Sequence, residues 1–328
     1  MSIQRNCAVL ALVFGYLVFS NFAIAATLTW DAGGDGTGWY DGANWNPDTV
    51  PSSNTSDNLI VNSGTPTAIT NAGLISGGTL TINGGAVTWN GRFHAIGTTT
   101  GGPLSTGTLT LLSGSLTRNY TGGASNNFTI GNGANTNGLI DQQGGTVSVL
   151  GNGATATDQR LAIGVGDASA KGEYRISGGS LSVSGNLLNG ETSGATATFH
   201  YIGDDATVAV GGQYLSTFAS TKTIFELDGL ARTIINVTDN VSLNNSTVQI
   251  SAMTGHSIAQ GTIFTLFSSG SSLSTTSTTL TYDSSQWLVT VGSNTLTAQY
   301  LVPEPSSMML TMAACIGGVL LRRRGMQS

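Results

Sequence analysis

The sequence predicts an all-β protein built from repeated strands, and three observations lead to this fold class. Charged residues make up 9% of the 328 residues, while 46 residues are glycine; a globular domain usually has about a quarter charged residues. With 39% hydrophobic residues, the chain has enough apolar surface to build a core rather than remain disordered. Apolar and hydroxyl residues alternate with period two at 79–82, 108–111, 146–149 and 180–183, which is typical of strands.

A repeat of about 33 residues organises the stretch 71–220. Ile96, Ile130 and Ile163, each followed by glycine, lie 34 and 33 residues apart, and Ile202 opens a weaker fourth copy. Self-similarity at a fixed period is typical of stacked supersecondary units. About three short strands with glycine corners fit one coil of a parallel β-helix, or β-solenoid, with Ile, Leu and Val inside and Thr and Ser outside. A β-sandwich of hairpins is the alternative, because antiparallel strands give the same alternation.

The stretch 26–70 is rich in tryptophan, with Trp30, Trp39 and Trp45. These rings can cover the apolar end of a first coil that has no neighbour, and we expect an N-terminal cap. A carbohydrate platform is the alternative, because exposed aromatic rings stack on sugars.

The repeats and this opening resemble the Gly/Thr/Ser-rich strand repeats of autotransporter passengers and related bacterial surface proteins. The opening pattern consists of tryptophans, an Asn-Trp pair, a proline turn and an aspartate: Trp30, Trp39, Asn44, Trp45, Pro51 and Asp57.

The stretch 221–301 departs from the repeat and carries denser strand signals. Its last part, 287–301, reads as two strands joined at 292–294. We expect a C-terminal β cap that closes the stack, or a small β-domain. Further β-helix with irregular coils is the alternative.

The N-terminal stretch 1–25 has the pattern of a secretory signal peptide. Arg5 supplies the positive charge, and 7–19 is the apolar core. Ala23 and Ala25 form a small-x-small cleavage site, which makes Ala26 the first mature residue. Export machinery and a signal peptidase are therefore expected partners; an uncleaved signal anchor is the alternative.

The C-terminal stretch 302–328 has three parts in a fixed order. Pro303, Glu304 and Pro305 form an extended joint, because proline continues neither helix nor sheet. The apolar run 308–321 follows, and a basic cluster ends it: Arg322, Arg323 and Arg324.

These three parts resemble the PEP-CTERM sorting signal of exported proteins of Gram-negative bacteria. The resemblance implies a single transmembrane helix at 306–321 in the inner membrane and an Arg-rich cytoplasmic tail. It also implies that an exosortase-type enzyme cuts at the Pro-Glu-Pro joint and releases the protein to the cell surface or extracellular matrix. A permanent anchor without cleavage is the alternative.

The charge limits the classes of partner, and the cysteine content limits the possible disulfides. Between the two terminal segments, seven basic residues stand against 16 acidic residues, a net charge of −9 that argues against nucleic acid and anionic lipid. The only cysteines, Cys7 and Cys315, lie in the terminal segments, so a processed chain has no disulfide framework.

Candidate catalytic residues are sparse. His94, His200 and His256 have no metal-ligand spacing, and no hydrolase or metalloprotease motif is present. Polysaccharide lyases and hydrolases with a β-helix gather acidic and basic groups on one face. The residues that could be gathered in this way are one acidic pair and one charged set within a single repeat: Asp204 and Asp205, and Asp158, Arg160, Asp167, Lys171 and Arg175. Solvated coil surface is the favoured interpretation of both groups.

Asp31, Asp35 and Asp41 lie among glycines, as in a calcium loop, but they match neither the EF-hand nor the nonapeptide repeat. We therefore expect turns there, and neither a metal nor a cofactor.

The sequence indicates an exported, non-enzymatic protein of the cell surface or extracellular matrix. We expect a structural or adhesive role in exopolysaccharide or biofilm, with extracellular polysaccharide as a candidate partner. Two alternatives stay open: a polysaccharide lyase or hydrolase on the same β-helix, and a glycan-binding module that uses exposed tryptophans.

Overall fold

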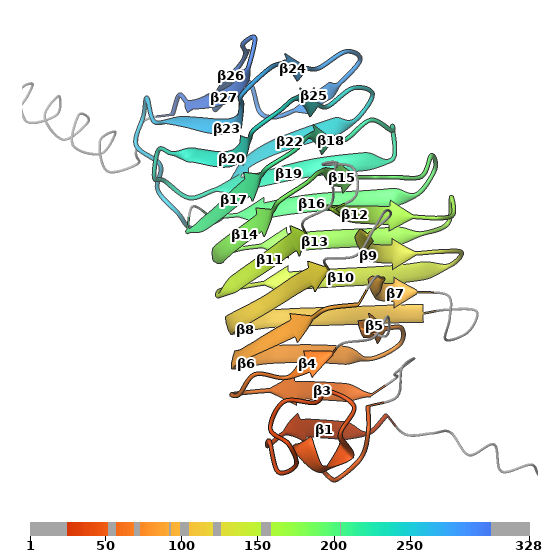
Figure 1. The fold of residues 1–328 in the computed structure, drawn as a ribbon. Coiled ribbons are helices and arrows are strands. Elements are labelled where there is room, and N and C mark those ends of the chain that lie inside the picture. The colour runs from red at the N-terminus through yellow and green to blue at the C-terminus, as the bar shows by residue number, and fades with distance from the viewer. Residues whose placement is uncertain are drawn as a thin grey trace, which may run out of the picture.

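The computed structural model describes residues 25–51, 57–68, 73–91, 93–98, 105–120, 126–151, 159–203 and 205–302. Within these ranges the chain is all-β, and its one helical element is the short 3-10 helix η2 (Gly42–Asn44). The strands form a β-solenoid of about eight turns. They lie as rungs from β1 at one end to β26 and β27 at the other (Figure 1).

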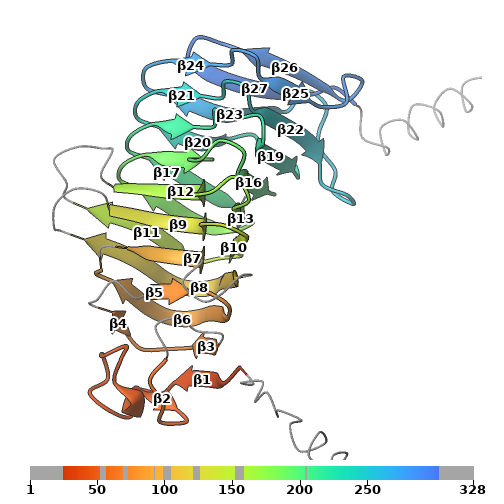
Figure 2. The same ribbon diagram turned by 90° about the vertical axis from the view of Figure 1, so that its right-hand side faces the viewer.

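Each turn contributes strands to three parallel columns (Figures 1 and 2). The first column contains β1 (Thr27–Trp30), β3 (Asn58–Val61), β6 (Thr79–Trp89), β8 (Ser105–Tyr120), β10 (Thr136–Gln142), β13 (Lys171–Ile176), β16 (Thr196–Ile202), β19 (Thr221–Leu227), β22 (Thr247–Ala252) and β25 (Thr279–Thr281). The second column contains β4 (Thr67–Ala68), the second halves of β6 and β8, β11 (Thr146–Gly151), β14 (Gly179–Val183), β17 (Ala206–Val210), β20 (Thr233–Val237) and β23 (Ile263–Ser269). The third column contains β5 (Gly73–Ile75), β7 (His94–Thr98), β9 (Asn126–Asn132), β12 (Gln159–Val165), β15 (Leu187–Asn189), β18 (Tyr214–Leu215), β21 (Val241–Ser242) and β24 (Leu273–Ser274).

Antiparallel strands occur at the two ends of the stack. At the N-terminal end, β2 (Trp45–Asn46) pairs antiparallel with β1. At the C-terminal end, β27 (Thr295–Tyr300) pairs antiparallel with β23 and with β26 (Trp287–Val291). Parallel pairing between all the intervening rungs confirms the β-solenoid and rules out the β-sandwich.

The register explains the repeat and also its limit. Ile96, Ile130 and Ile163 lie opposite one another on β7, β9 and β12, as their spacing predicts. Opposite Ile163 on the next rung is Asn189, whereas Ile202 lies on β16 in the first column, so the predicted fourth opening is wrong. The glycines after the four stacked residues have φ between 67° and 94°, a left-handed corner that glycine adopts without strain.

Coil length is not constant, and a uniform repeat of about 33 residues is not confirmed. Lys171 lies opposite Asn137, 34 residues earlier, but it lies opposite Thr196, only 25 residues later. The columns therefore continue from coil to coil although the corners between the strands become shorter. This is possible because the rungs pair through their backbones, which does not require corners of equal length.

The core lies between the columns and is continuous along the stack. Aromatic rings form two large groups inside it, and Phe264, Trp287 and Tyr300 form a smaller third group at the last strands. The N-terminal group contains Trp30, Trp45, Trp39, Trp89 and Phe128, whose rings pack edge to face with centroids 5.1–6.4 Å apart. The C-terminal group contains Tyr174, Phe199, Tyr214, Phe267, Phe225 and Tyr201.

No helix of the described residues is long and apolar enough to cross a membrane. Four predicted features lie outside the described residues and stay predictions. They are residues 1–24 of the signal peptide predicted at 1–25, the Pro-Glu-Pro joint, the transmembrane helix at 306–321 and the arginine cluster. Ala25 and Ala26 immediately precede β1.

Glycine permits backbone-to-backbone contact between the first and third columns. A Cβ at Gly138 on β10 would meet the Ile96 carbonyl oxygen and the Gly131 amide nitrogen, and Gly172 on the next rung has the same relation to Ile130 and Gly164. Both neighbours are backbone atoms of paired strands and have little freedom to move away.

We therefore expect Gly138→Ala to lower the free energy of unfolding by about 2–3 kcal/mol, as overpacking does. Urea denaturation of the protein measures this change. Asn137→Ala, an exposed neighbour on the same strand, is the matched control and should change little. Equal stability of the two variants would contradict the close approach.

Candidate functional site

The charged residues that sequence reasoning selected are not gathered on one face. Arg160 lies on β12 in the third column and forms an ion pair with Glu191 (2.5 Å), whereas Lys171 and Arg175 lie on β13 in the first column. Asp167 lies in the turn after β12, where its carboxylate accepts from the Ser169 amide and hydroxyl (2.8 and 2.6 Å). Asp158 and Asp204 lie outside the described residues, and Asp205 precedes β17.

A different charged group does converge, on the outer face of the first column. It contains Glu173 and Arg175 of β13, His200 of β16 and Glu226 of β19, and we call it the charged ladder. The Nδ1 atom of His200 lies 3.6 Å from Glu173 Oε1, and its Nε2 atom lies 3.2 Å from Glu226 Oε1. Arg175 Nη2 donates to Glu173 Oε1 at 3.1 Å.

Strand alternation and register build the charged ladder. Glu173 and Arg175 are two residues apart on one strand and therefore point to the same face. His200 lies opposite Arg175 on the next rung, and Glu226 follows one rung later. Hydrogen bonding to His200, together with the nearby Arg175 charge, holds the pKa of Glu173 below its usual value despite partial burial. The outward position of each residue could be read from the alternation, but their convergence required the register.

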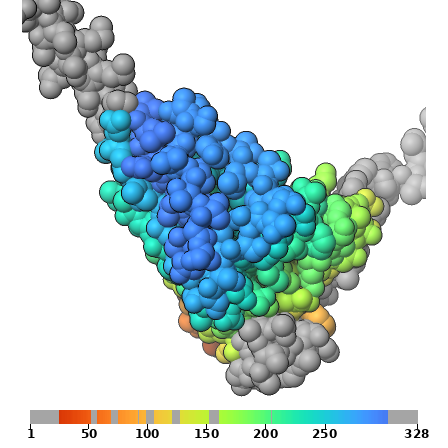
Figure 3. Space-filling model, turned by 90° about the horizontal axis from the view of Figure 1, so that it is seen from above, coloured from red at the N-terminus to blue at the C-terminus, as the bar shows by residue number. Residues whose placement is uncertain are grey.

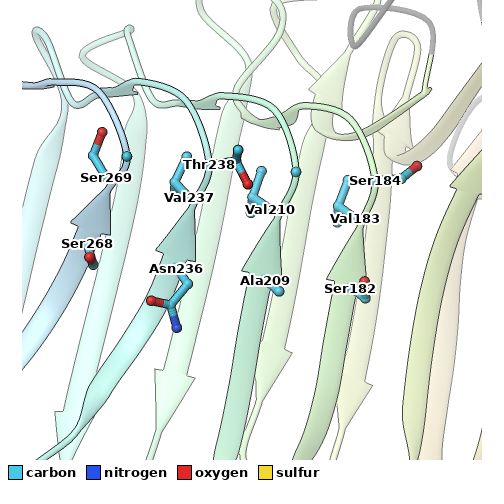
Figure 4. Close-up of a pocket in the computed structure, with 12 residues that line it drawn as sticks. Ser182, Val183, Ser184, Ala209, Val210, Asn236, Val237, Thr238, Ser268 and Ser269 are labelled. Atoms are coloured by element: carbon cyan, nitrogen blue, oxygen red, sulfur yellow. The ribbon is translucent and has the colours of Figure 1, made fainter.

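A neutral groove crosses the ends of four strands of the second column (Figure 4). Its volume is about 380 Å³. One row of its lining comprises the outward residues Ser182, Ala209, Asn236 and Ser268, which lie opposite one another on β14, β17, β20 and β23. The next row comprises the corner residues Ser184, Gly211, Thr238 and Gly270. The lining contains no charged residue.

Small residues hollow out this face. A Cβ at Gly270 would meet the Thr238 carbonyl, and one at Gly211 would meet the Ser184 carbonyl, so backbone forms part of the floor. Buried Ser269 holds the corner by donating to the carbonyls of Asp239 (2.6 Å) and Ser272 (2.9 Å). The groove thus combines a backbone floor with hydroxyl and amide groups on β14, β20 and β23, whereas the β17 rung between β14 and β20 contributes only Ala209, Val210 and Gly211. Neighbouring rungs are spaced by about 4.8 Å.

The tryptophans do not form an exposed platform. Trp30 and Trp39 are 3% exposed and Trp45 is fully buried, with its indole N–H donating to the Trp39 carbonyl (2.9 Å). The exposed rings that a tryptophan-based glycan module requires are absent from this part of the described chain. Burial at the N-terminal end matches the covering role expected of a cap.

The aspartates of the same region organise turns. Asp35 Oδ1 accepts from the amides of Thr37 (2.8 Å) and Gly38 (2.6 Å) and from the Asn44 side chain (2.7 Å). These donors, Gly38 first, lower the pKa of Asp35 to about 2. Asp31 and Asp41 accept from the amides two residues ahead of them. No group of three or more His, Cys, Asp or Glu side chains suited to a metal ion occurs among the described residues.

His94 lies inside the stack, away from both surface sites. Its ring is fully buried and stacks on Trp89 with centroids 5.1 Å apart, and neither ring nitrogen has a hydrogen-bond partner. Burial, and secondarily the charge of Arg118, lower its pKa to about 3. His94 is therefore a core residue, and His256, which lies 3.9 Å from Asp228, is a surface residue.

Comparison of the chain with protein-family models, with curated proteins and with solved structures found no match.

The buried His94 predicts a loss of stability in acid. The unfolded chain binds a proton at this histidine below about pH 6.5, whereas the folded chain binds it only near pH 3. Stability is therefore lost across that window as the pH falls, by about 2–3 kcal/mol at about pH 4.5. His94→Phe should reduce this loss, whereas His256→Gln should preserve it. Urea midpoints from pH 7 to pH 4 measure the difference, and parallel pH profiles for H94F and the unmodified protein would contradict the assignment.

Proposed function

We propose that this protein is an exported, non-enzymatic structural or adhesive component of the cell surface or extracellular matrix, and that it binds extracellular polysaccharide along the neutral groove. The observation that carries the proposal is the groove itself. It presents serine, threonine and asparagine groups on three of its four rungs, β14, β20 and β23, while β17 contributes Ala209, Val210 and Gly211, and its lining has no charge. Hydroxyl and amide groups both donate and accept hydrogen bonds, as sugar hydroxyls do.

The terminal segments support the export part of the proposal. Signal-peptide cleavage after Ala25 would leave the chain one residue before β1, and the Pro-Glu-Pro joint begins three residues after the end of β27. Both proposed processing sites thus flank the folded stack. We further propose that the PEP-CTERM-like segment inserts in the inner membrane as a transient or permanent anchor, and that an exosortase-type enzyme acts at the joint.

A polysaccharide lyase or hydrolase is the second candidate, and the charged ladder is the observation that favours it. Two carboxylates flank the imidazole of His200, and paired carboxylates serve acid–base chemistry in glycoside hydrolysis. The described pocket, however, lies on the second column and includes no member of the ladder. The ladder also pairs its charges internally, which is sufficient reason for its presence on the surface.

Filling the groove tests polysaccharide binding. We expect Ala209→Trp to weaken binding to the polysaccharide of the native cells by at least about tenfold, or about 1.4 kcal/mol, because the indole would occupy the groove. Thr207→Trp, also outward on β17 but outside the lining, is the matched control. Affinity electrophoresis of the exported protein in polysaccharide gels measures both. Equal mobility shifts for A209W and T207W would contradict groove binding.

The two candidates also differ in product formation. On the structural proposal, incubation of the protein with the same polysaccharide releases neither reducing ends nor unsaturated products. If cleavage occurs and Glu226→Gln abolishes it, while Glu191→Gln in the pair with Arg160 preserves it, the ladder is catalytic and the non-enzymatic proposal is wrong.

A further inference from the structure

Exposed aliphatic side chains gather where the described chain leaves the stack. They are Leu230, Ile263, Leu288 and Leu301, with 66%, 51%, 51% and 36% of their surface exposed, and we call them the apolar rim. Large exposed aliphatic side chains that cluster mark contact surfaces more often than those scattered singly.

Register and hydrogen bonds bring the rim residues together. Ile263 on β23 and Leu288 on β26 both lie opposite Gln299, from its two sides. Leu301 follows directly after the end of β27, two residues beyond Gln299. Leu230 lies in the turn before β20, and this turn reaches the start of β23 because the Thr265 amide donates to the Arg232 carbonyl (3.0 Å). The strands β20, β23, β26 and β27 lie together at this end (Figure 1), and the last described segments form the end seen from above (Figure 3).

The surroundings of the rim carry little charge, and the backbone groups of Leu301 at the exit are paired. Asp283 is the only charged residue between 258 and 302, and beside Leu230 lie Asp228, Arg232 and His256. The Leu301 amide donates to the Gln286 carbonyl, and its carbonyl accepts from the Gln260 side chain, both at 2.8 Å. Covering the exit with an apolar medium would therefore leave no backbone group of Leu301 unpaired.

The tether length selects the occupant. Only five residues, 303–307, separate Val302 from the apolar run 308–321, and even a fully extended linker of this length spans at most about 18 Å. While that run is in a bilayer, the rim must lie close to its surface. A net charge of −9 between the terminal segments argues against electrostatic attraction to anionic lipid, so the contact would be made by the aliphatic side chains.

We propose that the apolar rim rests on the surface of the lipid bilayer that holds the C-terminal segment, so that the solenoid docks on the membrane rather than moving freely on its linker. The inference rests on the proposed membrane insertion of that segment. The lining of the groove on the second column includes no rim residue, so docking through the rim does not use the groove's side chains.

Fluorescence in neutral vesicles tests the docking. The exported protein, with its C-terminal segment intact and Cys315→Ser, receives a single cysteine by Leu288→Cys, carries an environment-sensitive label, and is reconstituted in phosphatidylcholine and phosphatidylethanolamine. We expect a blue shift and at least about twofold stronger quenching by spin-labelled lipid than for the same label at Leu112→Cys. Leu112 is 40% exposed and lies on β8, five rungs from β23, which is about 24 Å along the stack.

Extraction of the same vesicles with alkaline carbonate separates the two proposals. Membrane-retained protein with equal quenching at both positions would overturn the docking and leave the anchor. Protein that is extracted and shows no shift would overturn both. A blue shift that appears without vesicles and grows with protein concentration would identify a second copy as the occupant and overturn the lipid contact.

Discussion

Parallel backbone pairing at a fixed rung spacing is the constraint on which the rest of this structure depends. A single coil of two to three dozen residues cannot bury both sides of its strands, and it is stable only against its neighbours. Glycine is what lets successive coils close on each other, because the first and third columns meet through backbone atoms at Gly107, Gly138 and Gly172. The high glycine content therefore follows from the cross-section of the solenoid.

The ends of the stack face a different problem, since an end coil has a neighbour on one side only. At the N-terminal end, Trp30, Trp39 and Trp45 are buried, and Trp45 packs edge to face against each of the other two. At the C-terminal end, the antiparallel strands β26 and β27 interrupt the parallel ladder. Trp287, the first residue of β26, is buried there. An edge strand such as β26 exposes unpaired backbone and invites further pairing unless it is covered. Both ends thus use large aromatic side chains, but the C-terminal end leaves aliphatic residues exposed.

The fold class could be predicted from the sequence because alternation and glycine corners are local signals. The stacking of Ile96, Ile130 and Ile163 followed from their equal spacing. The next rung failed because its coil shortens and places Asn189, a polar residue, in the column. A fixed spacing cannot predict that asparagine takes the place of isoleucine at this position. Asn189 is accommodated because its side-chain amide donates to the Lys222 carbonyl at 2.7 Å, a contact between separate coils.

The two surface sites were missed for the same reason. Ser182, Ala209, Asn236 and Ser268 are unremarkable in the sequence, and they form a groove only because the registers of three strand pairs align them. In the charged ladder, Glu226 lies far from Glu173 along the chain, so the sequence did not pair them. Proximity in sequence instead grouped Arg160 with Lys171 and Arg175, but Arg160 lies on the third column and they lie on the first. In a solenoid with coils of unequal length, sequence distance is a poor guide to which side chains share a face.

Hydrogen exchange of the protein, with and without the polysaccharide of its native cells, tests the proposed binding in the groove most directly. The account predicts added protection at the ends of β14, β17, β20 and β23, around 182–184, 209–211, 236–238 and 268–270, and little change in the charged ladder. Unchanged exchange in these four segments at saturating polysaccharide, or protection confined to the ladder, would contradict the assignment of the groove.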